Sequence, residues 1–136
     1  MKMVFADSHY WIAIVNPNDS WAEAAKKVRS SLGEIFIVTT DGVLTEFLAA
    51  LSKGEHMRKQ AAKMVRVILD NPNVRVIPQT RDSFLKGLTL YENRSDTEYS
   101  LTDCISMNVM KAESLVEVLT KDHHFEQEGF TVLIKR

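Results

Sequence analysis

Short apolar runs and longer segments with helical spacing alternate along the whole chain. Runs of strand length occur at Met3–Ala6, Ile35–Val38, Val74–Ile77, Val116–Leu119 and Phe130–Ile134. The segments between them repeat apolar residues every three or four positions, as an amphipathic helix does. This alternation is typical of βαβ units. It predicts a single α/β domain, residues 1–136, with about five strands in a central, mostly parallel sheet.

Turn and capping signals set the bounds of the predicted helices. Ser20 followed by Glu23 has the pattern of a capping box, which predicts a helix that starts at Trp21. Thr80 can cap a later helix, and the polar stretch 92–99 is expected to be a loop. Helices are expected at Tyr10–Val15, Trp21–Leu32, Asp41–Ser52, Met57–Leu69, after Thr80 as far as Tyr91, and Leu101–Ala112.

Composition and charge narrow the class of protein. Hydrophobic residues make up 45% and charged residues 26%, the formal net charge is −1, and the pI is about 6.4. A basic nucleic-acid-binding domain usually has a pI above about 9, so any contact with nucleic acid must come from a local patch or a bridging cation. The single cysteine, Cys104, excludes an internal disulfide and suits a reducing compartment. With no signal peptide and no apolar stretch of spanning length, the expectation is a cytoplasmic protein without a membrane segment.

Four acidic residues stand at the ends of the predicted elements, namely Asp7, Glu46, Asp103 and Asp122. In an open parallel sheet, strands end and the following helices begin at one edge, where ligands bind. Clustered carboxylates repel one another, so they call for shared protons or a bound cation. The chain has no Gly-rich phosphate loop, no G-x-S-x-G and no H-E-x-x-H motif. The acids therefore favour metal-assisted hydrolysis of a phosphodiester over catalysis by a nucleophilic side chain.

Each acid also has a purely structural interpretation. Asp7 can be an N-cap, Glu46 a solvated helix charge, and Asp122 part of a turn. Asp103 comes three residues after Ser100, which is a capping-box spacing. Taken alone, Glu46 is better explained as a surface charge and Asp103 as a helix cap. The argument for a functional site is that all four acids are expected at the same edge of the sheet.

The surroundings of the four acids resemble the four motifs of the PIN domain family. The matching segments are residues 4–13 (VFADSHYWIA), 39–48 (TTDGVLTEFL), 100–106 (SLTDCIS) and 119–130 (LTKDHHFEQEGF), in order and over nearly the whole chain. The resemblance implies a three-layer α/β/α sandwich and a ribonuclease that depends on Mg²⁺ or Mn²⁺. It assigns metal-binding roles to Asp7, Glu46, Asp103 and Asp122, and a supporting hydrogen bond within the pocket to Thr120. Family members of this size are often toxins of toxin–antitoxin pairs, commonly dimeric and silenced by a small antitoxin.

One position departs from the family pattern. Many members have serine or threonine two residues after the first acid, where this chain has His9. Either Ser8 takes over that hydroxyl's contact or the contact is missing.

Several other residues near the motifs have weaker claims on the chemistry. A zinc site at His123 and His124 lacks further ligands at a convincing spacing, so a surface or RNA-facing pair is the preferred interpretation. Cys104 is read as a small buried helix residue. Asp41 is expected to cap its helix, and Asp96 to lie in a mobile loop. The scattered cations Arg94, Lys111 and Lys121 carry little weight as phosphate contacts.

Three other functions compete with a toxin nuclease. The protein can be a solitary RNA-processing nuclease, or a non-catalytic module that keeps the fold and binds RNA or protein. A phosphoacceptor domain of the response-regulator type needs an aspartate after its third strand. Here that strand is followed by Pro78 and Gln79, which argues against this class.

Overall fold

The structure, a computed structural model, describes all 136 residues and contains one five-stranded sheet. The strands are β1 (Lys2–Ala6), β2 (Ile35–Thr40), β3 (Val74–Ile77), β4 (Glu117–Leu119) and β5 (Thr131–Val132). Their order in the sheet is β3-β2-β1-β4-β5, and every neighbouring pair is parallel. The predicted α/β class is confirmed, and the sheet is wholly parallel rather than mostly so.

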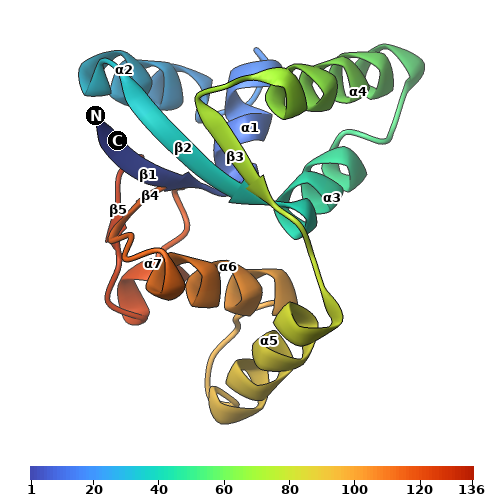
Figure 1. Ribbon diagram of the computed structural model, residues 1–136. Helices are drawn as coiled ribbons and strands as arrows, with labels where there is room; N and C mark the ends of the chain where they lie inside the picture. Colours follow the sequence, from blue (N-terminus) through green and yellow to red (C-terminus); the bar gives the residue numbers. More distant parts are fainter.

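The structure contains seven helices. They are α1 (Ser8–Val15), α2 (Ala22–Leu32), α3 (Asp41–Ala50), α4 (Glu55–Asp70), α5 (Arg81–Asn93), α6 (Leu101–Ala112) and α7 (His124–Gln127). Figure 1 shows α1, α2 and α4 on one side of the sheet and α6 and α7 on the other, with α5 packed outside α6. The three-layer arrangement is therefore the one that the family resemblance implied. None of the helices combines the length and apolar character that crossing a membrane requires.

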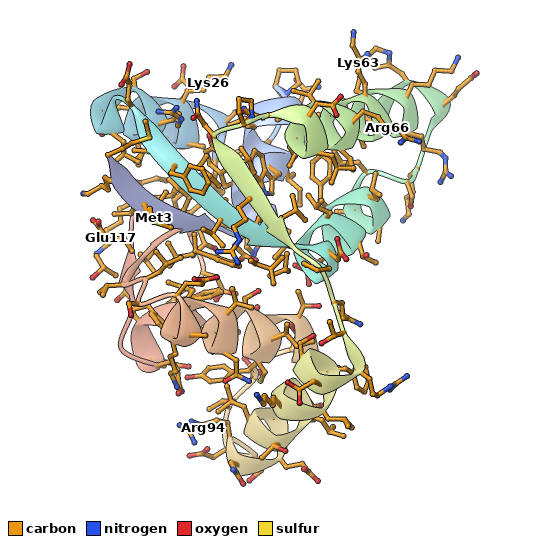
Figure 2. All side chains as sticks on the ribbon, viewed as in Figure 1. Met3, Lys26, Lys63, Arg66, Arg94 and Glu117 are labelled. Carbon is orange, nitrogen blue, oxygen red and sulfur yellow. The ribbon has the colours of Figure 1, made fainter.

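The core explains why the strand sequences are continuously apolar. Val4, Phe5 and Ala6 of the central strand β1 are completely buried, because helices cover both faces of the sheet. The rings of Phe47 from α3 and Phe125 from α7 are also completely buried. In Figure 2, side chains fill the space between the layers, whereas charged residues such as Lys63 of α4 project outward.

One predicted capping box is absent. Helix α2 begins at Ala22, its N-cap is Trp21, and no side chain caps it. Asp19 Oδ2 instead accepts a hydrogen bond of 2.9 Å from the Trp21 amide. An aspartate turn thus precedes the helix, and Ser20 and Glu23 do not form the predicted pair.

Other bounds differ by a few residues. Strand β2 extends to Thr40, because Thr39 and Thr40 pair with Val76 and Ile77 of β3. Strand β5 pairs with β4 only at Thr131 and Val132, which is shorter than the apolar run of the sequence. Helix α7 was not predicted. The Thr80 cap of α5 is confirmed, and Ser83 completes its capping box.

Candidate active site

The order of the strands reverses between β1 and β4, and the region beyond the carboxyl ends of these two strands is called the crevice below. The chain steps from β1 outward to β2 and β3, and then returns to the other side of β1 with β4. Such a reversal of strand order is where open parallel sheets bind ligands, beyond the carboxyl ends of the strands. The Asp7 amide donates to the Leu119 carbonyl at 3.1 Å, so the chain segments that leave β1 and β4 start side by side.

Asp7 follows β1 directly, at the edge of the sheet where the crevice lies. Its side chain is 2% exposed, and although Asp7 is the N-cap of α1, the carboxylate makes no capping hydrogen bond. Oδ2 accepts a hydrogen bond from Thr120, while Oδ1 is buried without any hydrogen-bond partner. Burial, with a further contribution from the carboxylates of Asp103 and Glu46, raises the pKa of Asp7 to about 7. Asp7 therefore occupies the predicted N-cap position, but its carboxylate does not cap the helix.

Thr120 links the segment after β4 to Asp7. Its fully buried hydroxyl donates to Asp7 Oδ2 at 3.0 Å and accepts from the Asp122 amide at 3.1 Å. One side chain therefore fixes both the orientation of the Asp7 carboxylate and the turn that carries Asp122.

Asp103 serves the helix and the crevice together. Its Oδ2 accepts from the Ser100 amide at 3.0 Å, and its own amide donates to Ser100 Oγ at 3.0 Å, so the predicted capping box is present. Burial raises the pKa of this carboxyl, and the nearby charges of Asp122 and Glu46 raise it further. The cap thus holds a buried carboxylate within the electrostatic reach of the other acids.

Glu46 comes to the crevice from α3. It is partly buried, and its Oε1 accepts a short hydrogen bond from the Ser8 hydroxyl, so it is not a free surface charge. His9 lies among the same acids, and burial together with the charge of Lys121 lowers its pKa. Next to the first acid, Ser8 therefore supplies a hydroxyl contact to one of the other acids, and whether it replaces the contact of the family pattern stays a prediction.

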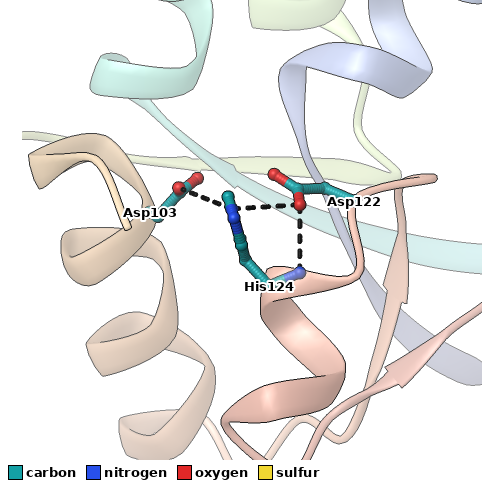
Figure 3. Close-up of side chains that lie close together, drawn as sticks. All are labelled: Asp103, Asp122 and His124. Carbon is teal, nitrogen blue, oxygen red and sulfur yellow. Dashed lines mark hydrogen bonds and ion pairs between the residues drawn. The ribbon is translucent and has the colours of Figure 1, made fainter. Parts of the chain in front are cut away.

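His124 is the residue that the sequence did not place in the crevice. Its Nδ1 lies 3.1 Å from Asp122 Oδ1 and 3.8 Å from Asp103 Oδ2, as Figure 3 shows. The surface interpretation is correct for His123, whose side chain is 73% exposed, and wrong for His124, which is 17% exposed. The unpredicted helix α7 begins at His124 and turns this side chain inward, since the His124 amide also bonds to Asp122 at 3.0 Å.

The spare acid Asp41 does not belong to the crevice. The N-cap of α3 is Thr40, whose hydroxyl accepts from the Val43 amide at 3.1 Å. Asp41 Oδ2 accepts from the Gln79 amide at 3.0 Å and so fastens the segment after β3. The expectation that Asp41 caps its helix is wrong because the preceding threonine takes that role.

The donors in the crevice fit a divalent cation. One oxygen each from Asp103 and Asp122 and one nitrogen from His124 lie within 4.8 Å of one another. Asp7 and Glu46 are not part of this group of three. Asp7 lies within electrostatic reach of Asp103 and has a buried carboxylate oxygen without a hydrogen-bond partner, and burying such an atom is costly unless something pairs with it. Hard oxygen ligands suit Mg²⁺ and Mn²⁺, and imidazole is a further ligand for transition metals.

The fold and this crevice define a member of the PIN domain family. Residues 4–130 match the sequence model of the PIN domain, and the chain belongs to that family. It is similar, at 27% identity over 129 residues, to the 23S rRNA-specific endonuclease VapC20 of Mycobacterium tuberculosis. That match covers 94% of this chain and 95% of VapC20.

Solved structures show the same fold. The crystal structure of Mycobacterium tuberculosis VapC20, a Sarcin-Ricin loop cleaving toxin, aligns with a TM-score of 0.85 at 24% identity, covering 94% of this chain and 96% of that one. VapBC2 from Rickettsia felis, bound to a DNA fragment from their promoter, aligns at 0.65 with 12% identity. FitAcB from Neisseria gonorrhoeae aligns at 0.64 with 15% identity. For each of these last two structures, the match covers 96% of both chains.

Proposed function

We propose that this protein is an endoribonuclease that depends on Mg²⁺ or Mn²⁺ and acts as the toxin of a toxin–antitoxin pair. The observation that carries the proposal is Asp7. It is a buried carboxylate with one unpartnered oxygen, at the reversal of strand order in a PIN-domain sheet. Glu46, Asp103 and Asp122 complete the set of acids around it.

The four carboxylates would hold the cation, with His124 as an additional nitrogen donor. When bound, a divalent cation polarises the phosphodiester and makes a water molecule a stronger nucleophile at neutral pH. Thr120 keeps the Asp7 carboxylate in one orientation, and Ser8 does the same for Glu46. Such supporting hydrogen bonds raise the precision and affinity with which ligand oxygens are presented.

The substrate class that we propose is structured RNA with an exposed loop. VapC20 is a 23S rRNA-specific endonuclease, and the similarity to it spans 94% of this chain. The formal net charge of −1 gives the whole molecule no general attraction for nucleic acid. Recognition must therefore depend on local contacts around the crevice, as is usual when an unpaired RNA loop is bound.

The direct test is cleavage of purified ribosomal RNA in MgCl₂ or MnCl₂. Replacing Asp7 with Asn removes the charge and keeps the shape, so Asp7→Asn should reduce the cleavage rate at least about 100-fold, and Asp103→Asn should act similarly. Asp70→Asn, at the exposed end of α4, is the matched control and should cleave at the wild-type rate. If Asp7→Asn cleaves as fast as the control while circular dichroism shows both variants folded, the assignment is wrong.

The toxin role has its own test. The four motifs resemble those of toxins silenced by a small antitoxin, so we also propose such a partner, a homodimeric state and a cytoplasmic location. Induced expression of the wild-type chain in bacteria should stop growth, and expression of Asp7→Asn should not. A solitary processing nuclease would cleave RNA in vitro yet leave growth unaffected, which would remove the toxin role and retain the activity.

A further inference from the structure

A cavity of about 530 Å³ opens beside the acid cluster and shares His124 with it. Its lining consists of the loop 94–99 together with His123, His124, Gln127 and Glu128. Pockets for small ligands have volumes of roughly 300–1,000 Å³, so one unit of a polymer such as a nucleotide fits this one. Neither the acid cluster nor the family match accounts for it.

One wall of the cavity is held rigidly by Glu128. Its side chain is 7% exposed and accepts hydrogen bonds from Arg94 Nε and Nη2, both at 3.0 Å, from Tyr99 Oη at 3.1 Å and from Lys111 Nζ at 3.1 Å. The bonds from Arg94 hold the pKa of Glu128 at about 2, so the group is ionised. Arg94 is labelled in Figure 2 beside the end of α5. This network ties the loop 94–99 to α6 and α7, which gives the cavity its shape before any ligand enters.

The charges of the lining argue against a phosphate as the occupant. Asp96, Glu98 and Glu128 are all acidic, and the guanidinium of Arg94 is already paired with Glu128. A phosphate there would meet more negative than positive charge. The occupant should be uncharged and able to form hydrogen bonds, because the exposed Gln127 offers an amide, whereas the Thr97 hydroxyl already donates to the Arg94 carbonyl.

The aromatic groups of the lining suit a flat ring. The His123 and His124 ring centroids are 4.8 Å apart, and those of Tyr99 and His124 are 5.7 Å apart. His123 is 73% exposed, so one of its faces is free. Aromatic side chains of this kind stack on unpaired bases, which have flat faces whatever their sequence.

We propose that this cavity binds an unpaired nucleobase of the RNA next to the phosphate that is cleaved. His123 stacks on the base, and Gln127 hydrogen-bonds to its edge. His124 contacts the acid cluster on one side and lines the cavity on the other, so the base and the reacting phosphate belong to adjacent positions of one strand. The inference rests on the proposed ribonuclease function and adds the residues that select the loop nucleotide.

Binding can be measured without cleavage in the Asp7→Asn protein, using fluorescein-labelled single-stranded RNA hexamers of the four homopolymers and fluorescence anisotropy. Adding His123→Ala should weaken binding at least fivefold, since stacking on one aromatic side chain accounts for a large part of such affinities. Adding Gln127→Ala should change the ranking of the four hexamers. The matched controls are His56→Ala and Gln60→Ala, which remove the same residue types from the exposed surface of α4.

A second measurement uses the wild-type protein and an RNA substrate that it cleaves. In a series of such substrates, an abasic nucleotide replaces one nucleotide at a time around the cleavage site. Deleting the base that occupies the cavity should raise KM at least fivefold in the wild-type protein and have little effect in His123→Ala, because the two changes remove the same contact. The inference is overturned if His123→Ala and Gln127→Ala behave like their controls on α4. If the wild-type protein cleaves no RNA, the proposed function is wrong instead. The hexamer measurements then show separately whether the cavity binds a base.

Discussion

At the scale of single residues, the crevice depends on hydroxyl groups as much as on acids. Asp7 is buried, and only one of its two carboxylate oxygens has a partner, the Thr120 hydroxyl. Thr120 also accepts from the Asp122 amide. The hydroxyl therefore holds two of the proposed ligands in relative position, although it would not itself bind the cation.

Replacing Thr120 with valine tests this link. The shape is kept, both hydrogen bonds are lost, and the partner groups remain buried, so we expect a loss of about 1–3 kcal/mol in the free energy of unfolding. Cleavage should fall about 10- to 100-fold, the usual effect of removing a group that orients a metal ligand. Urea denaturation and a cleavage time course measure the two effects. Thr120→Ser keeps the hydroxyl and should recover most of the activity, and equal activity in the two variants would contradict the role.

At the scale of elements, α5 packs closely against α6 at Gly87. A β-carbon added to Gly87 would lie 2.4 Å from Ile105 Cγ1, which no packed pair of atoms tolerates. Gly87→Ala should therefore lower the free energy of unfolding by about 1–3 kcal/mol through overpacking. Gly42→Ala is the control. It is also helical, its nearest neighbour would lie at an ordinary 3.5 Å, and alanine there should be neutral or stabilising by about 0.5–1 kcal/mol. Similar losses in both variants would show that close packing at Gly87 is unimportant.

The Glu128 network joins the loop 94–99 to α6 and α7, and its contribution depends on pH. Glu128 has a pKa of about 2 in the folded protein against an ordinary 4.5, so its stabilisation is present above pH 4.5 and is lost as the pH falls toward 2. Glu128→Gln should lower the melting temperature at pH 7, and the difference from the wild-type protein should shrink between pH 4.5 and pH 2. Calorimetry over this range measures it. A difference that stays constant with pH would mean that the charge of Glu128 contributes nothing.

The sequence predicted the strands and the long helices well, and it predicted the short helix and one of the helix caps poorly. Strands and long helices are recognisable because many residues repeat one pattern, and the capping box of Ser100 and Asp103 is equally explicit. The box expected at Ser20 is absent because the helix starts one residue later, with Trp21 as its N-cap, and the Asp19 carboxylate accepts from the Trp21 amide. Helix α7 has four residues, too few to show any period.

The same limit explains which part of the candidate site was missed. Three of the four acids follow a strand or cap a helix, so an element boundary marks their place. The position of His124 depends on the short turn after Asp122, where nothing in the sequence distinguishes it from its exposed neighbour His123. The cavity beside it is formed by a loop tied to α7 by ionic contacts, and residues distant in sequence make those contacts.

At the scale of the whole molecule, the acid cluster should make the metal-free protein less stable as the pH rises. Asp7 has a pKa of about 7 when folded against an ordinary 3.8, so its favourable contribution is complete below about pH 3.8 and is lost as the pH rises through 7. In EDTA, Asp7→Asn should therefore melt at a higher temperature than the wild-type protein at pH 8, with a smaller difference at pH 5. The two curves should be compared by calorimetry at both pH values. A wild-type protein that is the more stable of the two at pH 8 would contradict the direction of this pKa.

Divalent cations should restore the stability that the metal-free protein loses when Asp7 ionises. A cation that binds only the folded state stabilises it by RT ln(1 + [L]/Kd), about 2.7 kcal/mol at a concentration of 100 Kd. MnCl₂ should therefore raise the melting temperature of the wild-type protein, and by more at pH 8 than at pH 5.5, since at the lower pH protons compete for Asp7. Asp7→Asn should respond much less, whereas Asp70→Asn should respond as the wild-type protein does. An equal rise in all three proteins would mean that the cation binds elsewhere than at Asp7.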